Sequence, residues 1–126
     1  MTKGRKQRVL VCGGRKFEDG ELLTMTLDLY KPSMALLIQG GASGADNLAN
    51  RWALDNGIVS VTFHAPWPGL GKAAGPIRNQ TMLDVAKPDL VLAFPGGTGT
   101  RDLCKRAKGM GIDTREVLRP KSLVSS

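Results

Sequence analysis

The sequence predicts a single three-layer α/β domain with a mainly parallel sheet of about five strands. Short apolar runs of strand length alternate along the chain with longer stretches in which apolar residues have helical spacing. The apolar runs contain few polar positions, which is typical of strands covered by helices on both faces. At 126 residues, the chain has the length of one domain with a substantial core.

The expected elements follow one another as strand and helix from end to end. The expected strands are residues 8–13, 34–39, 58–63, 89–94 and 112–117. The expected helices are residues 18–30, 43–56, 76–87 and 99–110. Gly57 and Gly111 directly follow two of these helices, where glycine commonly ends a helix. Pro76 suits a first helical turn, because its missing N–H would be unpaired there anyway.

The charged residues predict an anionic partner and basic chain ends. The chain has 18 Lys and Arg against 11 Asp and Glu, a net charge of +7, which favours binding of polyanions. Much of the excess lies outside the expected domain at residues 8–118, in an N-terminal segment 1–7 and a tail 119–126 that are expected to be flexible. Basic groups on such ends often only increase solubility, so the charge alone does not distinguish nucleic acid from a small anion.

The remaining composition predicts a cytoplasmic protein without a metal site. No apolar stretch approaches membrane-spanning length, and the N-terminus lacks the apolar core of a signal peptide. The two cysteines, Cys12 and Cys104, lack metal-binding spacing and suit buried thiols in a reducing compartment. His64 is the only histidine. No metal ligand set or cofactor is evident beyond a nucleotide or nucleotide-derived ligand.

Three glycine-rich turns follow three of the expected strands. They are Gly13-Gly14, the segment GGASGAD at residues 40–46 and the segment PGGTGT at residues 95–100. Glycine lets backbone N–H groups approach an anion closely, and the following helix directs its positive end to the same place. In doubly wound sheets, ligands bind at the carboxyl ends of the strands where the strand order reverses. The turns therefore predict a phosphate cradle at that edge.

Two widespread phosphate-binding motifs are not met. The dinucleotide motif G-x-G-x-x-G does not fit Gly13-Gly14, and no acidic residue ends the second strand. The Walker A loop does not fit Gly71-Lys72, because Ala73 stands where Ser or Thr would bind magnesium.

Several polar residues near the turns are candidates for ligand contacts. Arg78 and Arg15 are candidates for binding phosphate through their guanidinium groups, although Arg78 also suits a surface ion pair. Asp46 and Asn79 suit a ribose, but Asp46 also suits a first helical turn without any ligand, and Asn79 and Ser43 also suit helix capping. The expected ligand-binding residues are Gly13, Gly14, Arg15, Gly40, Gly41, Ser43, Gly44, Asp46, Arg78, Asn79, Gly96, Gly97, Thr98, Gly99 and Thr100.

The irregular stretch at residues 64–75 is expected to be a lid or a pocket wall, because it is too long for an ordinary connection. Trp67 would stack on a base, or simply stiffen the loop with the prolines around it. Lys72 would close over an anion, or remain solvated.

In the order and spacing of Gly13-Gly14-Arg15, residues 40–46, GPIRN at residues 75–79 and residues 95–100, the chain resembles the SLOG superfamily of Rossmann-like domains. The resemblance covers residues 8–118 and is greatest to the YspA branch, related to the C-terminal part of YpsA. The superfamily includes the LOG phosphoribohydrolases, which cleave the N-glycosidic bond of nucleoside monophosphates, the DNA-processing DprA proteins and nucleotide-signal sensors. The resemblance implies a nucleotide-type ligand and a homodimer.

The sequence departs from the LOG pattern at one position. Where that pattern has its catalytic glutamate, this chain has Leu103, and Asp102 is one residue earlier, about 100° around a helix. Three functions therefore stay open. The first is nucleotide binding, as a sensor or sequestering protein. The second is an N-glycosidase-type hydrolase using Asp46, Asp102 or His64. The third is weak DprA-like nucleic-acid binding.

Overall fold

The computed structural model describes residues 6–65 and 71–118 and confirms the expected three-layer α/β fold. Its five strands form one parallel sheet in the order β3-β2-β1-β4-β5. The strands are β1 (Gln7–Cys12), β2 (Met34–Gln39), β3 (Ser60–Thr62), β4 (Leu90–Ala93) and β5 (Asp113–Glu116). The helices are α1 (Gly20–Tyr30), α2 (Ala45–Asp55), α3 (Ala74–Thr81) and α4 (Thr98–Gly109). Short 3-10 turns lie at Lys31–Ser33 and Gly71–Ala73, and a π-helical segment, Met82–Ala86, continues α3.

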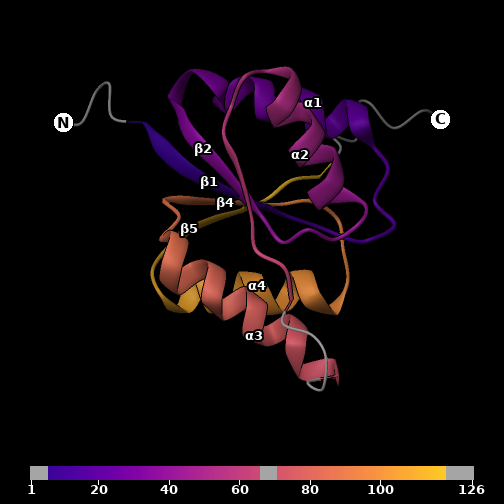
Figure 1. The fold of residues 1–126 in the computed structure, drawn as a ribbon, viewed down its shortest axis with the longest axis vertical. Helices are drawn as coiled ribbons and strands as arrows, with labels where there is room; N and C mark the ends of the chain where they lie inside the picture. Colours follow the sequence, from indigo (N-terminus) through magenta and orange to yellow (C-terminus); the bar gives the residue numbers. More distant parts are fainter. Residues whose placement is uncertain (1–5, 66–70, 119–126) are drawn as a thin grey trace.

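Helices cover both faces of the sheet. Figure 1 shows α1 and α2 on one face and α3 and α4 on the other. Successive strand residues point to opposite faces. In β1, Val9 and Val11 accordingly pack in the apolar cluster under α1 and α2, while Leu10 and Cys12 pack in the cluster under α3 and α4. This double burial explains why the central strands β1, β2 and β4 are largely apolar, whereas the edge strands β3 and β5 carry polar residues that are half-buried or exposed.

Several element boundaries differ from those expected. The second helix begins at Ala45 rather than residue 43, because Gly44 has a φ of +77° and cannot be part of the helix. The third helix begins at Ala74, so Pro76 is its third residue. The first helix begins at Gly20, because the side chain of Asp19 accepts a hydrogen bond from the N–H of Leu22 and so caps it.

The helix ends agree with the expected ones, and the strand bounds differ by a few residues. Gly57 and Gly111 have φ values of +67° and +77°, as expected for glycines that end helices. β3 is shorter than the expected strand 58–63, and β1 begins at Gln7, one residue before the expected domain start. Residues 1–5 and 119–126 of the expected tails lie outside the described residues. Within the described chain, no helix combines the length and apolar character that crossing a membrane requires.

The strand order reverses at β1. The chain continues from β1 through β2 to β3 on one side, and then crosses over to β4 and β5 on the other side of β1. The turns after β1, β2 and β4 therefore meet at the carboxyl edge of the sheet, where ligands of doubly wound proteins bind.

Candidate functional site

The three glycine turns are joined by backbone hydrogen bonds. The N–H of Gly14 donates to the carbonyl oxygen of Pro95 at 2.9 Å, which connects the β1 turn to the β4 turn. The carbonyl oxygen of Gly14 accepts from the N–H of Ala45 at 3.2 Å, which connects the β1 turn to the start of α2. The three turns therefore meet at one edge of the sheet, and their predicted role as a phosphate cradle stays a prediction.

Most glycines of these turns are required by close packing within the protein. A β-carbon at Gly13 would lie 2.6 Å from that of Ala45, and one at Gly96 would lie 2.6 Å from the backbone nitrogen of Gly14. Gly44 has a left-handed φ, and its β-carbon would overlap the carbonyl oxygen of Gly14. These residues allow the turns to approach one another, whether or not a ligand is bound.

Gly97 and Gly99 have no such packing role. A β-carbon added at either residue would meet nothing within 4 Å. Gly97 is the N-cap of α4, and residues 95–99 are exposed. The N–H groups of the first helical turn have no carbonyl partner within the helix, and the helix dipole is positive there. An anion therefore has open access to the start of α4.

Asp46 holds the turn after β2. Its Oδ2 accepts hydrogen bonds from the N–H groups of Gly40 at 3.1 Å and Ala42 at 3.2 Å. The residue is 6% exposed, and burial raises its pKa to about 6 despite these two hydrogen bonds and the positive charge of Arg78. In the free protein this carboxyl group is therefore a structural acceptor, and its predicted contact with a ribose stays a prediction.

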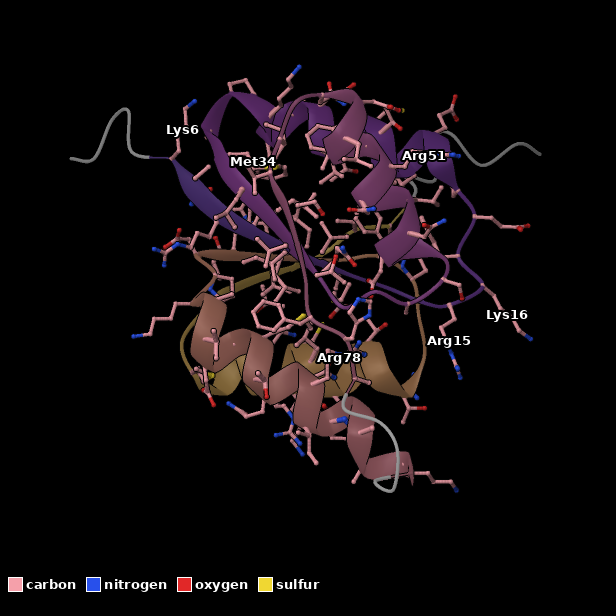
Figure 2. All side chains as sticks on the ribbon, viewed as in Figure 1. Lys6, Arg15, Lys16, Met34, Arg51 and Arg78 are labelled. Atoms are coloured by element: carbon pink, nitrogen blue, oxygen red, sulfur yellow. The ribbon has the colours of Figure 1, made fainter. Side chains whose placement is uncertain are left out.

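Arg78 also contacts the turn after β2. Its Nη1 donates to the carbonyl oxygen of Gly40 at 2.6 Å, and its Nε donates to Oδ1 of Asn79 at 3.0 Å. Because α3 begins at Ala74, Arg78 lies in the second turn of the helix and not in the first as expected. Figure 2 shows Arg78 between the sheet and the lower pair of helices.

Asn79 connects Arg78 to α4. Only 3% of Asn79 is exposed, and its Nδ2 donates to the carbonyl oxygen of Gly99 at 3.2 Å and to Oδ2 of Asp102 at 3.0 Å. Its side chain does not cap a helix start, since it follows Arg78 within α3. A continuous set of hydrogen bonds thus extends from the β2 turn to the first turn of α4, and it sets the position of α4 relative to the cradle.

The position that corresponds to the LOG glutamate is in the core. Leu103 is 1% exposed and packs in the apolar cluster under α3 and α4. Asp102 is outside that cluster and accepts hydrogen bonds from Asn79 and from Nε of Arg106 at 2.9 Å. Burial raises the pKa of Asp102, but these hydrogen bonds and the charges of Arg106 and Lys105 outweigh it, so the pKa lies below its ordinary value. The lowered pKa favours the carboxylate form of Asp102, paired with Asn79 and Arg106, and its predicted role as a catalytic residue stays a prediction.

Three further candidate residues lie near the carboxyl edge of the sheet: His64, Arg15 and Ser43. His64 is exposed and lines a cavity of about 200 Å³ beside Gly41, between β2, β3 and α2. Ser43 does not cap α2, as was one expectation, because its hydroxyl donates to the carbonyl oxygen of Arg15 at 3.2 Å. The side chain of Arg15 is exposed, and Figure 2 shows it pointing outward beside Lys16.

The long loop is described only in part. Trp67 lies outside the described residues, so its expected stacking on a base is not addressed. Lys72 is exposed in the 3-10 turn before α3. Among residues 6–65 and 71–118, no three His, Cys, Asp or Glu side chains are grouped as metal ligands would be.

A groove of about 710 Å³, which the sequence analysis did not predict, lies between the β4 turn, α4 and the end of β5. Its walls include Phe94, Pro95 and Leu118, and its cationic side chains include Arg101 and Lys105. The signal in the sequence is the four-residue spacing of these two cations directly after PGGTGT, which places them on one face of a helix. The groove extends the cradle along α4.

The fold and site define a Rossmann-like α/β domain with glycine turns gathered at the carboxyl edge of its sheet. The family described as the YspA, cpYpsA-related SLOG family matches residues 7–68, and the chain belongs to this family. A curated relative, the Gene 61 protein of Mycobacterium phage D29, is 37% identical over 116 residues, covering 84% of this chain and 92% of the relative.

Two solved structures share the fold. DNA processing protein A (DprA) from Streptococcus pneumoniae matches 95% of this chain with a TM-score of 0.73 at 18% identity, and the chain spans 52% of that protein. A UDP-N-acetylglucosamine 2-epimerase matches 92% of this chain with a TM-score of 0.56, also at 18% identity, over 33% of its own length. At these identities the similarity concerns the fold.

Proposed function

We propose that this protein binds a nucleotide or nucleotide-derived metabolite, with a phosphate group on the first turn of α4. The observation that carries the proposal is the open space above Gly97 and Gly99. A β-carbon at either position would meet nothing within 4 Å, so packing against a β-carbon does not explain glycine there. Close approach of a ligand to the backbone does explain it.

The surroundings of α4 support a ligand larger than phosphate. The cavity beside His64 and the groove beside Arg101 flank the cradle on its two sides. The cavity is lined by amide, hydroxyl and imidazole side chains, which suit a sugar or the polar edge of a base. The groove combines apolar walls with cations, which suits a base or a second anionic group.

Binding without cleavage is the simpler form of this function. Leu103 is in the core and Asp102 is occupied by Asn79 and Arg106, so the LOG arrangement for glycosidic cleavage is not reproduced. A sensor or a sequestering protein requires only the cradle. To test binding without cleavage, a nucleotide that binds is incubated with the protein and the mixture is analysed for free base by chromatography. An intact nucleotide is expected, and release of the base would show hydrolysis instead.

A thermal-shift panel of nucleoside mono-, di- and triphosphates, ADP-ribose, NAD and cyclic nucleotides tests binding. A ligand at 100 times its dissociation constant adds about 2.7 kcal/mol of stability, which gives a clear shift. The matched variants are Gly99→Leu and Gly109→Leu, because both glycines are in α4 and both have open space around them. We expect both variants to fold and only Gly99→Leu to lose the ligand shift. An undiminished shift in Gly99→Leu would contradict the proposed phosphate position.

The cations of the groove favour nucleic acid as a second candidate. Arg101 and Lys105 are one helical turn apart beside the exposed β4 turn. Binding to a single-stranded oligonucleotide that weakens steeply with salt, and that is lost in a double Arg101→Glu, Lys105→Glu variant, would support this candidate. Retained binding in that variant would place the nucleic-acid contact elsewhere.

A further inference from the structure

The two cysteines of the chain come together in the fold, although they are far apart in the sequence. Cys12 is the last residue of β1, and Cys104 lies in the second turn of α4. Both belong to the apolar cluster under α3 and α4, and each is 8% exposed. Their side chains meet because Cys12 points to this face of the sheet and Cys104 lies on the face of α4 that covers it.

The two thiols interact directly and are not equivalent. The interaction with the Cys104 side chain, together with burial, raises the pKa of Cys12 well above its ordinary value. The same interaction, with help from the charge of Lys108, lowers the pKa of Cys104 to about 7 against burial and the charge of Glu116. Asp46 and Arg78 also act on Cys12, in opposite directions. The directions of the two shifts favour ionisation of Cys104 before Cys12.

The two cysteines differ in their position relative to the groove beside α4. Cys104 lines the groove of about 710 Å³ together with Gly96, Thr100 and Lys105, whereas Cys12 does not line it. A small reagent that enters this groove therefore meets Cys104 and not Cys12 in its wall.

We infer that Cys104 is a peroxide-reactive thiol and that Cys12 is its resolving partner, so that oxidation forms a disulfide between β1 and α4. The Cys104 thiolate attacks hydrogen peroxide; a sulfur–oxygen bond forms, the oxygen–oxygen bond breaks, and the hydroxide that leaves takes up a proton as water. The sulfur of Cys12 then attacks the sulfur of the resulting sulfenic acid and gives up its proton to the departing oxygen; the sulfur–oxygen bond breaks, the disulfide forms and a second water leaves. In total two thiols are oxidised and one hydrogen peroxide is reduced to two water molecules.

This disulfide would connect two parts of the cradle. Cys12 directly precedes Gly13-Gly14, and Cys104 is one helical turn after Thr100. The covalent bond would hold the β1 turn and the start of α4 at a single separation. The inference concerns thiol chemistry and does not depend on the nature of the ligand.

The test uses the wild-type protein. Brief treatment with iodoacetamide under native conditions, followed by peptide mapping, should show Cys104 alkylated at least about tenfold faster than Cys12, since the thiolate is the nucleophile. Treatment with hydrogen peroxide should give a monomer whose mass is lower by two hydrogen atoms, with the peptides of Cys12 and Cys104 joined. Faster alkylation of Cys12, disulfides that only join two chains, or two reduced cysteines at peroxide concentrations that oxidise free cysteine would each overturn the inference.

Two variants give an independent measurement of the order of steps. Cys12→Ser removes the resolving thiol, so peroxide should leave a sulfenic acid at Cys104 that dimedone traps. Cys104→Ser should leave Cys12 reduced under the same treatment. Circular dichroism of both variants confirms folding before oxidation, and trapping of Cys12 rather than Cys104 would refute the assignment of roles.

Discussion

Replacing Asp46 by Asn should change how the stability of this protein depends on pH. The asparagine side chain has the same size, and its amide oxygen can still accept the hydrogen bonds from Gly40 and Ala42. What the variant lacks is a group that titrates. In the wild-type protein, burial raises the pKa of Asp46 from 3.8 to about 6, so the folded state favours the neutral carboxyl.

The sign and size of the effect follow from this shift. A folded-state pKa above the unfolded value means that the folded protein binds a proton more tightly. The resulting stabilisation is fully present below the unfolded pKa and is lost as pH rises through about 6. A shift of about two pKa units corresponds to about 3 kcal/mol at about 1.4 kcal/mol per unit.

The assay is urea denaturation of both proteins at several pH values between about 4 and 7. We expect the free energy of unfolding of the wild type, relative to Asp46→Asn, to fall by about 2 to 3 kcal/mol over this range. Titration of the other groups occurs in both proteins and cancels in the difference. A difference that is constant within about 0.5 kcal/mol, or one that rises with pH, would refute the idea that burial governs the pKa of Asp46.

Three further substitutions test the cradle and its support. Arg78→Ala removes the charged donor to the carbonyl oxygen of Gly40 and should cost about 1.5–3 kcal/mol in urea denaturation, so an unchanged midpoint would speak against this contact. Gly44→Ala introduces a side chain at left-handed φ against the carbonyl oxygen of Gly14 and should cost more than about 1–2 kcal/mol, measured as a lower Tm. Leu103→Glu places a carboxylate in the core and should unfold the protein without creating hydrolase activity; cooperative unfolding at the wild-type midpoint would show that the position is not buried.

Local patterns were sufficient for most of the fold. Apolar runs without polar alternation correctly indicated the buried central strands β1, β2 and β4, and Gly57 and Gly111 correctly marked helix ends, because these signals depend on near neighbours in the chain. Boundaries were less accurate where a long-range contact intervened. The start of α2 is one example, since the backbone of Gly44 is shaped by its contact with the β1 turn.

The sequence predicted where the glycine turns meet, but not which contacts their residues make. The convergence of three turns followed from the rule that parallel strands end at the same edge. The sequence could not separate Gly44 and Gly96, which packing requires, from Gly97 and Gly99, which have open space. It also could not show that Arg78 already bonds the backbone at Gly40, because that contact joins residues from two different elements.

The sequence by itself determined the family, the α/β architecture and the edge of the sheet where the three glycine turns gather, because these depend on motif order and on the periodicity of apolar residues. Only the tertiary structure decided which side chains hold the cradle together, that Leu103 faces the core, and that Cys12 and Cys104 meet between β1 and α4. Those facts depend on how helices are placed over the sheet, and contacts between distant segments form only when the whole core packs.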